Sequence, residues 1–150
     1  MTHTVVEVYP GEGVEPKVDL ASVEQALHAV LEAEGVREGV LSVAYIGDAE
    51  ISEMNQRFLG HQGPTDVISF ALHDPGEIPH GDIYVGADQA TRQAAELGVP
   101  VAEELLRLAI HGTLHVLGYD HPDDPERTAS PMFVRQEALL AQVLADAELP

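Results

Sequence analysis

The chain alternates short segments that are apolar at every second position with longer segments that are apolar every three or four positions. The first pattern predicts strands and the second predicts amphipathic helices. Strands are expected at residues 3–9, 40–47, 65–72 and 81–87. Helices are expected at residues 19–34, 48–59, 88–98, 100–117 and 130–147. Two strand–helix pairs, a strand pair and three helices predict one α+β domain over residues 1–150, or a mixed α/β one, with a mixed four-stranded sheet and about five helices.

Residue types at the helix ends support these boundaries. Asp48 and Ser130 are expected to cap the helices that they open, because their side chains accept hydrogen bonds from unpaired amides. Gly118 is expected to end the fourth helix, since glycine adopts the left-handed conformation found there. The second helix is expected to bury one stripe, formed by Ile51, Met54 and Phe58.

Composition indicates a single globular domain. The 150 residues are 45% apolar and include no cysteine, and the mean hydropathy is −0.03. No stretch of eighteen apolar residues and no basic-then-apolar leader is present, so neither a membrane span nor a signal peptide is expected. The absence of cysteine excludes disulfides and thiolate ligands, and it fits a cytoplasmic location.

The chain is strongly acidic, with 26 acidic and 7 basic residues and a formal net charge of −19. Such a surface repels phosphate backbones, so tight non-specific binding of nucleic acid is not expected. The charge serves either solubility or the binding of a basic partner, such as a ribosomal protein.

The segment AIHGTLHVLGYDHPDD, residues 109–124, holds three histidines within eleven residues. His111 and His115 lie four apart and therefore share one helix face, and the turn at Gly118 leads on to His121. Three imidazoles leave a fourth position open, as in a catalytic zinc site. We predict one Zn²⁺ per chain on the penultimate long helix and its following turn. Ni²⁺, Cu²⁺ and Fe²⁺ are the alternatives for an all-nitrogen ligand set.

The spacing H-x3-H-x5-H, with its glycine, also matches the histidine skeleton of metzincin peptidases. In those enzymes a glutamate follows the first histidine and serves as the general base. Gly112 stands at that position here, which argues against a peptidase.

Three blocks of the chain resemble the YbeY family of bacterial endoribonucleases: HGTLHVLGYDH at 111–121, GPTDVISF at 63–70 and GDIYV at 81–85. The resemblance implies a zinc-dependent endoribonuclease specific for single-stranded RNA. It implies a role in 16S rRNA 3′-end maturation and in ribosome quality control, with His111, His115 and His121 as zinc ligands. The family usually carries an arginine where Leu59 stands, and Arg57 is the nearby candidate to replace it. Ala71 occupies a place where the family often has proline.

Other polar residues are candidates with two interpretations each. Asp120 either acts as the general base or orients an imidazole and caps the turn. Thr65 and Asp66 either contact substrate or form a local turn. Arg107, one turn before His111, either meets a phosphate or pairs with Glu103 at i,i+4 spacing.

Three functions remain open at this point. The first is the zinc endoribonuclease, and the second is a zinc hydrolase of another bond, such as a peptide or amide. The third is a non-catalytic ribosome-assembly factor that zinc stabilises. The sequence does not choose between water and a 2′-hydroxyl as the nucleophile, and it does not identify the bond cleaved.

Overall fold

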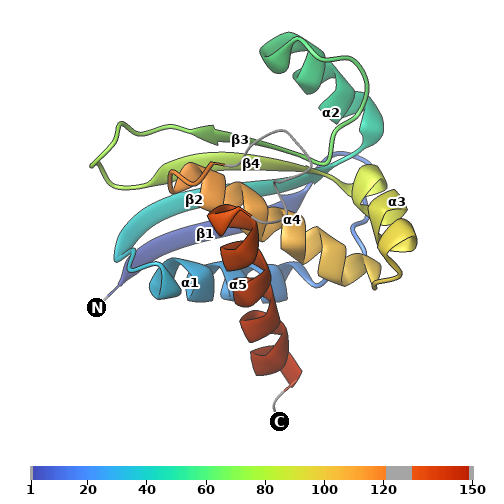
Figure 1. Ribbon diagram of the computed structural model, residues 1–150. Coiled ribbons are helices and arrows are strands. Elements are labelled where there is room, and N and C mark those ends of the chain that lie inside the picture. Colours follow the sequence, from blue (N-terminus) through green and yellow to red (C-terminus); the bar gives the residue numbers. More distant parts are fainter. Residues whose placement is uncertain (1, 121–129, 149–150) are drawn as a thin grey trace.

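The structure is a computed structural model that describes residues 2–120 and 130–148 (Figure 1). Four strands form one sheet in the order β1-β2-β4-β3. Their bounds are β1 His3–Pro10, β2 Glu38–Ile46, β3 Val67–Ala71 and β4 His80–Gly86. β1, β2 and β4 run parallel, and β3 pairs with β4 in the antiparallel direction. The predicted mixed four-stranded sheet is confirmed.

In the described part of the chain, five α-helices pack on or beside this sheet, close to the five predicted segments. They are α1 Leu20–Ala33, α2 Asp48–Met54, α3 Ala87–Leu97, α4 Val101–Val116 and α5 Pro131–Glu148. A π-helical turn, η1 Asn55–Leu59, extends α2. The predicted α+β single-domain fold is thereby confirmed.

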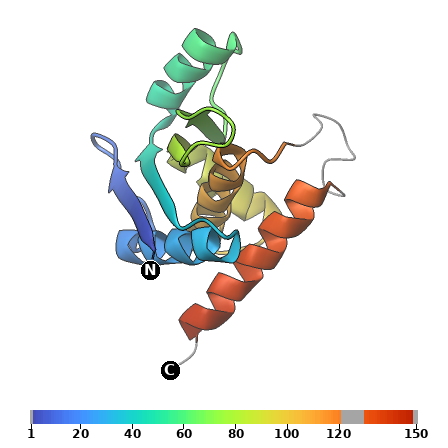
Figure 2. The ribbon, with the colours of Figure 1, turned by 90° about the vertical axis from the view of Figure 1, so that its left-hand side faces the viewer.

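The main core lies between one face of the sheet and the helices α1 and α4. Leu31 of α1, Val43 of β2, Ile83 of β4 and Leu114 of α4 are fully buried there. Helix α5 packs on α4 and α1 as an outer layer (Figure 2). Helix α2 packs on the other face of the sheet through the buried Ile51, and it projects beyond the sheet (Figure 1).

Helix α4 lies unusually close to β4 because glycines stand at two contact points. A Cβ at Gly112 would lie 2.5 Å from Ile83 Cγ2, and a Cβ at Gly81 would lie 2.5 Å from Val116 Cγ2. The buried Tyr45 hydroxyl also donates a hydrogen bond to the Leu105 carbonyl at 3.0 Å. Packing and this hydrogen bond hold the histidine-bearing helix in a fixed position on the sheet.

Two expectations about helix ends are confirmed. The Phe133 amide donates to Ser130 Oγ at 3.2 Å, so Ser130 caps α5. Gly118 has φ of 102°, the left-handed conformation that the end of α4 requires.

Two expectations about α2 are wrong. Asp48 is the first residue of the helix and Gly47 is its cap, while the Asp48 carboxylate pairs with Arg92 at 2.9 Å. Phe58 is 55% exposed instead of buried. Phe58 belongs to η1, where the wider π-helical turn breaks the 3.6-residue period that the prediction assumed.

Among the helices in the described part of the chain, none is long and apolar enough to cross a membrane.

Candidate metal centre

Helix α4 carries His111 and His115 on one face, as predicted. Their ring centroids lie 4.7 Å apart and the rings are nearly perpendicular, at 78°. The sequence predicts a helix buried on one side with its histidines on the opposite, open side. The structure instead buries α4 on most of its circumference and leaves both imidazoles half-buried, because α3 and α5 also pack against this helix.

The Nδ1 atom of His111 hydrogen-bonds with Gln136 of α5, at 2.6 Å from Oε1. The other end of the same amide, Nε2, donates to Glu137 Oε2 at 3.1 Å. A carboxylate only accepts hydrogen bonds, so it fixes the amide with Oε1 toward the imidazole. Nδ1 of His111 therefore donates to Oε1, and in the neutral ring this leaves the lone pair on Nε2.

His115 has the same tautomer for a different reason. Its Nδ1 lies 3.0 Å from the Tyr119 carbonyl oxygen, which can only accept a hydrogen bond. The end of α4 places this carbonyl through a Schellman motif, in which the Gly118 amide donates to the His115 carbonyl and the Tyr119 amide to the Leu114 carbonyl, both at 3.0 Å. The helix end thus supplies the acceptor that orients the second imidazole.

These two imidazoles fit a metal ion. Histidine ligands in proteins typically bind the metal through one ring nitrogen and donate the other N–H to a carbonyl or carboxylate, which fixes ring and tautomer. Both described histidines have that arrangement. The third predicted ligand, His121, lies outside the described residues, and within residues 2–120 and 130–148 no group of three potential ligands is complete.

A cavity of about 460 Å³ adjoins His111. It lies between α3, α4 and α5, and the segment before β3 also contributes. Three of the residues singled out from the sequence line it together: Asp66, Arg107 and His111. Leu97, Val99, Leu108 and Phe133 add apolar surface. A volume of this size accommodates a small organic group, such as part of a nucleotide.

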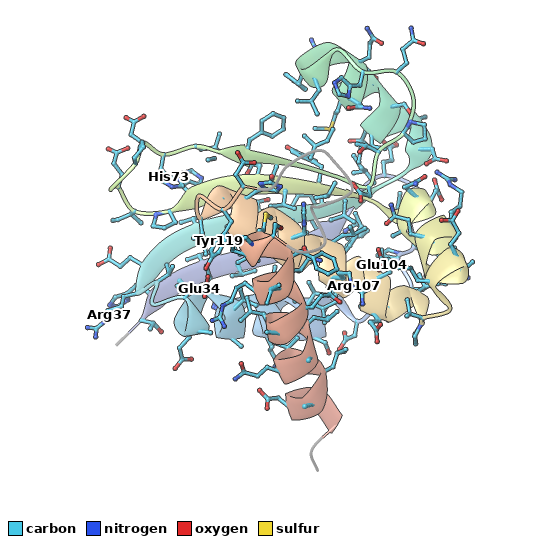
Figure 3. All side chains as sticks on the ribbon, viewed as in Figure 1. Glu34, Arg37, His73, Glu104, Arg107 and Tyr119 are labelled. Atoms are coloured by element: carbon cyan, nitrogen blue, oxygen red, sulfur yellow. The ribbon has the colours of Figure 1, made fainter. Side chains whose placement is uncertain are left out.

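Arg107 pairs with three carboxylates, and Figure 3 shows it close to one of them, Glu104. Arg107 pairs with Glu103 at 3.4 Å, with Glu137 at 3.0 Å, and with Glu104. The predicted i,i+4 pairing with Glu103 is confirmed. Burial raises the pKa of Glu104 above its ordinary value, while the hydrogen bond and charge of Arg107 oppose the shift.

The other predicted residues lie in different surroundings. Thr65 and Asp66 come just before β3, where the Gly86 amide donates to the Asp66 carbonyl at 2.8 Å and the Gln93 side chain donates to its carboxylate at 3.3 Å. Arg57 is exposed on η1, with its guanidinium 5.8 Å from the centroid of the Phe58 ring.

Two further residues named in the sequence analysis, Asp120 and Leu59, are exposed. Asp120 is exposed and directly follows Tyr119. Leu59 is 50% exposed. Arg57 and Leu59 do not line the cavity beside His111.

Sequence reasoning missed the partners that hold the imidazoles. Gln136 lies 25 residues after His111 on another helix, so no local pattern points to it. The contact of the Tyr119 carbonyl with His115 could have been predicted, because a helix that ends at Gly118 brings the next backbone groups back toward its last turn.

The close contact at Gly112 gives a structural reason why no peptidase glutamate stands at this position. This residue faces Ile83 of the sheet, so a side chain there would enter the core and not the space beside the imidazoles. The helix cannot carry the peptidase glutamate at this position without moving away from β4.

Fold and site together define a class: a single-domain α+β protein with a pair of oriented imidazoles on a helix held against a mixed sheet. The chain belongs to the endoribonuclease YbeY family, since the family described as Endoribonuclease YbeY matches residues 13–144. The predicted resemblance is therefore confirmed.

Individual proteins show the same relationship. The Endoribonuclease YbeY of Moorella thermoacetica is 43% identical over 136 residues, which span 83% of this chain and 86% of that protein. That of Syntrophus aciditrophicus is 41% identical over 128 residues, 81% of this chain and 79% of the relative. A solution structure of a Thermotoga maritima protein superposes with a TM-score of 0.67 at 29% identity, covering 95% of this chain and 91% of the other.

Proposed function

We propose that this protein is a zinc-dependent endoribonuclease, one domain over residues 1–150, that cleaves single-stranded RNA in the cytoplasm. Its place would be 16S rRNA 3′-end maturation and ribosome quality control. Membership of the Endoribonuclease YbeY family supports the nuclease activity. The observation that carries the proposal is the pair of imidazoles on α4, each with Nδ1 held by an acceptor.

His111, His115 and His121 are the proposed ligands of one Zn²⁺ per chain. When bound by neutral imidazoles, zinc lowers the pKa of water to about 7 and polarises a phosphoryl oxygen. The residues of this chain orient the imidazoles that would bind the metal. Gln136 and the Tyr119 carbonyl each accept from Nδ1 of one described ring, which leaves Nε2 of the neutral rings for the metal, so binding requires no change of tautomer.

Asp120 is the proposed proton acceptor for the attacking hydroxyl. It is an exposed carboxylate directly after the residue whose carbonyl holds His115. Orientation of an imidazole is its alternative role.

Four residues are proposed to contact the RNA: Arg57, Thr65, Asp66 and Arg107. Arg57 is the favoured phosphate ligand, because it is exposed and stands two positions before Leu59. Arg107 contributes less positive charge, since three carboxylates already pair with it. Asp66 shares the cavity with His111 and is suited to accept hydrogen bonds from a base or a ribose hydroxyl.

The net charge of −19 limits how firmly this chain can hold RNA without help. A basic protein partner, such as a ribosomal protein, would bring the enzyme to its RNA. Electrostatic attraction would support that contact.

The deciding experiment is cleavage of a labelled single-stranded RNA carrying the 3′ region of 16S rRNA by zinc-loaded, nuclease-free protein. We expect wild type to cleave it, His111→Ala to lose cleavage, and the exposed loop variant His61→Ala to retain it. Intact RNA with wild type would favour the non-catalytic assembly factor, and cleavage of casein instead of RNA would favour the peptide hydrolase. Mapping of rRNA 3′ ends in cells lacking the protein, with and without rescue by His115→Ala, then tests the cellular role.

A further inference from the structure

A connected set of side chains from α1 and α5 reaches the backbone that holds His115. The Tyr119 hydroxyl donates to Glu34 Oε1 at 2.5 Å. Arg135 of α5 binds the other oxygen of the same carboxylate, Oε2, through Nε at 2.9 Å and Nη2 at 2.8 Å. Figure 3 shows Glu34 and Tyr119 next to each other. Three segments that are far apart in the sequence therefore meet beside the metal centre.

Glu34 is rigidly placed at the end of α1. It is the C-cap residue, and the two residues after it close a Schellman motif: the Gly35 amide donates to the Glu32 carbonyl at 3.0 Å and the Val36 amide to the Leu31 carbonyl at 2.9 Å. Its side chain is only 10% exposed. Hydrogen bonds to a largely desolvated carboxylate are stronger than neutral or exposed ones. Glu34 thus provides a firm attachment point for the tyrosine.

Tyr119 needs such a point, because it follows a glycine in the left-handed conformation. Its backbone is held by its amide, which donates to Leu114, and by its carbonyl, which accepts from His115. Both contacts are to the last turn of α4 itself. The Tyr119 side chain ties this turn to other elements: it packs against the main core, and its hydroxyl donates to Glu34 at the end of α1. Loss of that bond would remove the direct link between the Tyr119 hydroxyl and the end of α1.

We propose that Glu34 and Arg135 are positioning residues for His115. They hold the Tyr119 ring, the ring fixes its own carbonyl, and the carbonyl keeps His115 in the Nδ1–H tautomer with the lone pair on Nε2. The inference rests on the metal site of the proposed function. Gln136 of α5 orients His111 directly, so two neighbouring residues of this helix, Arg135 and Gln136, orient the two histidines of α4 by separate routes.

The first test is the affinity for Zn²⁺, measured by competition with a chromophoric chelator. Tyr119→Phe, Glu34→Ala and Arg135→Met should each weaken binding by about tenfold, at the lower end of the usual effect of outer-sphere partners. Arg135→Lys should recover part of the loss, since it restores a cation beside Glu34. Arg92→Met, which removes the exposed ion pair with Asp48, is the matched control and should leave the affinity unchanged.

The second test uses metal-free protein and does not depend on activity or on zinc. Nitrogen NMR of the His115 ring, recorded well above the usual imidazole pKa of about 6.5, should show a single Nδ1–H tautomer in wild type and in Arg92→Met. The Tyr119→Phe and Glu34→Ala variants should show a mixture of the two tautomers. Circular dichroism and urea unfolding confirm that each variant is folded.

Folded variants with a wild-type tautomer and wild-type zinc affinity would overturn the positioning role. If wild type binds no zinc, the proposed metal site fails, and the NMR of His115 still decides this inference. If Tyr119→Phe does not fold, Glu34→Ala and Arg135→Met, which leave the tyrosine in place, provide the answer.

Discussion

The Nδ1 atom of His111 and the side-chain oxygen of Gln136 lie 2.6 Å apart across the contact between α4 and α5. Gln136 is only 4% exposed, and its amide is oriented in turn by Glu137. The last helix therefore contributes a side chain to the proposed metal centre in addition to covering the core.

Replacement of Gln136 should weaken the metal centre without removing a ligand. We expect Gln136→Ala to lower the affinity for zinc by about 10- to 100-fold, because His111 loses the acceptor that fixes its tautomer. Gln136→Glu keeps an acceptor and should retain most of the affinity. The exposed Gln142→Ala on the same helix is the control. Calorimetric titration of metal-free protein with zinc measures the effect, and wild-type affinity in Gln136→Ala would contradict it.

The ligand assignment predicts the metal content of the protein. Protein purified without chelators should contain about one zinc per chain by elemental analysis. His115→Ala should lose most of this metal, because two imidazoles hold zinc far less firmly than three. His61→Ala should keep it. Full zinc content in the His115→Ala protein would show that this residue is not a ligand.

The close approach of α4 to β4 predicts an unusual effect of alanine at Gly112. Alanine normally stabilises a helix interior relative to glycine by about 1 kcal/mol. Here its Cβ would lie 2.5 Å from Ile83 Cγ2, so we expect a net destabilisation of about 1–2 kcal/mol from overpacking. Urea unfolding measures it. In an Ile83→Ala background the same change should cost less, and an equal cost in both backgrounds would exclude the clash as the cause.

The burial of Glu104 predicts that the stability of the folded protein depends on pH. Burial raises the pKa of this carboxyl in the folded protein above the ordinary value of 4.5. The folded state then binds more protons than the unfolded state, so stability falls as pH rises from below 4.5 through the raised pKa. Glu104→Gln lacks this titration. The unfolding free energy of wild type relative to Glu104→Gln should therefore decrease with rising pH in that window, and the opposite slope would mean that Arg107 lowers the pKa overall.

The proposed contact between Arg57 and an RNA phosphate predicts that RNA binding depends on salt. If its guanidinium meets a phosphate, Arg57→Ala should weaken binding of single-stranded RNA and reduce the slope of log affinity against log salt by about 0.7. Arg37, also exposed, is the matched control, and Arg37→Ala should leave the slope unchanged. Fluorescence anisotropy over a range of salt concentrations gives both values. Equal slopes for wild type and Arg57→Ala would remove Arg57 from the RNA site.

Much of the fold follows from local patterns. Each predicted strand and helix has a counterpart in the structure, because apolar periodicity reports which face an element buries. The failure at Phe58 has a local cause, since a π-helical turn changes the period after Met54. The register of β3 against β4 and the close packing of α4 on β4 depend on which segments meet in the folded chain. Apolar periodicity carries no information about which segments meet.

The sequence by itself determined that His111 and His115 share a helix face and that Gly118 ends this helix, because both properties depend on spacing along one chain segment. Only the tertiary structure decided that Gln136 and the Tyr119 carbonyl orient the rings, that carboxylates from two helices surround Arg107, and that Glu34 and Arg135 meet at Tyr119. The reason is physical: a hydrogen bond between residues 25, 85 or 101 positions apart forms only after the core has packed the helices that carry them.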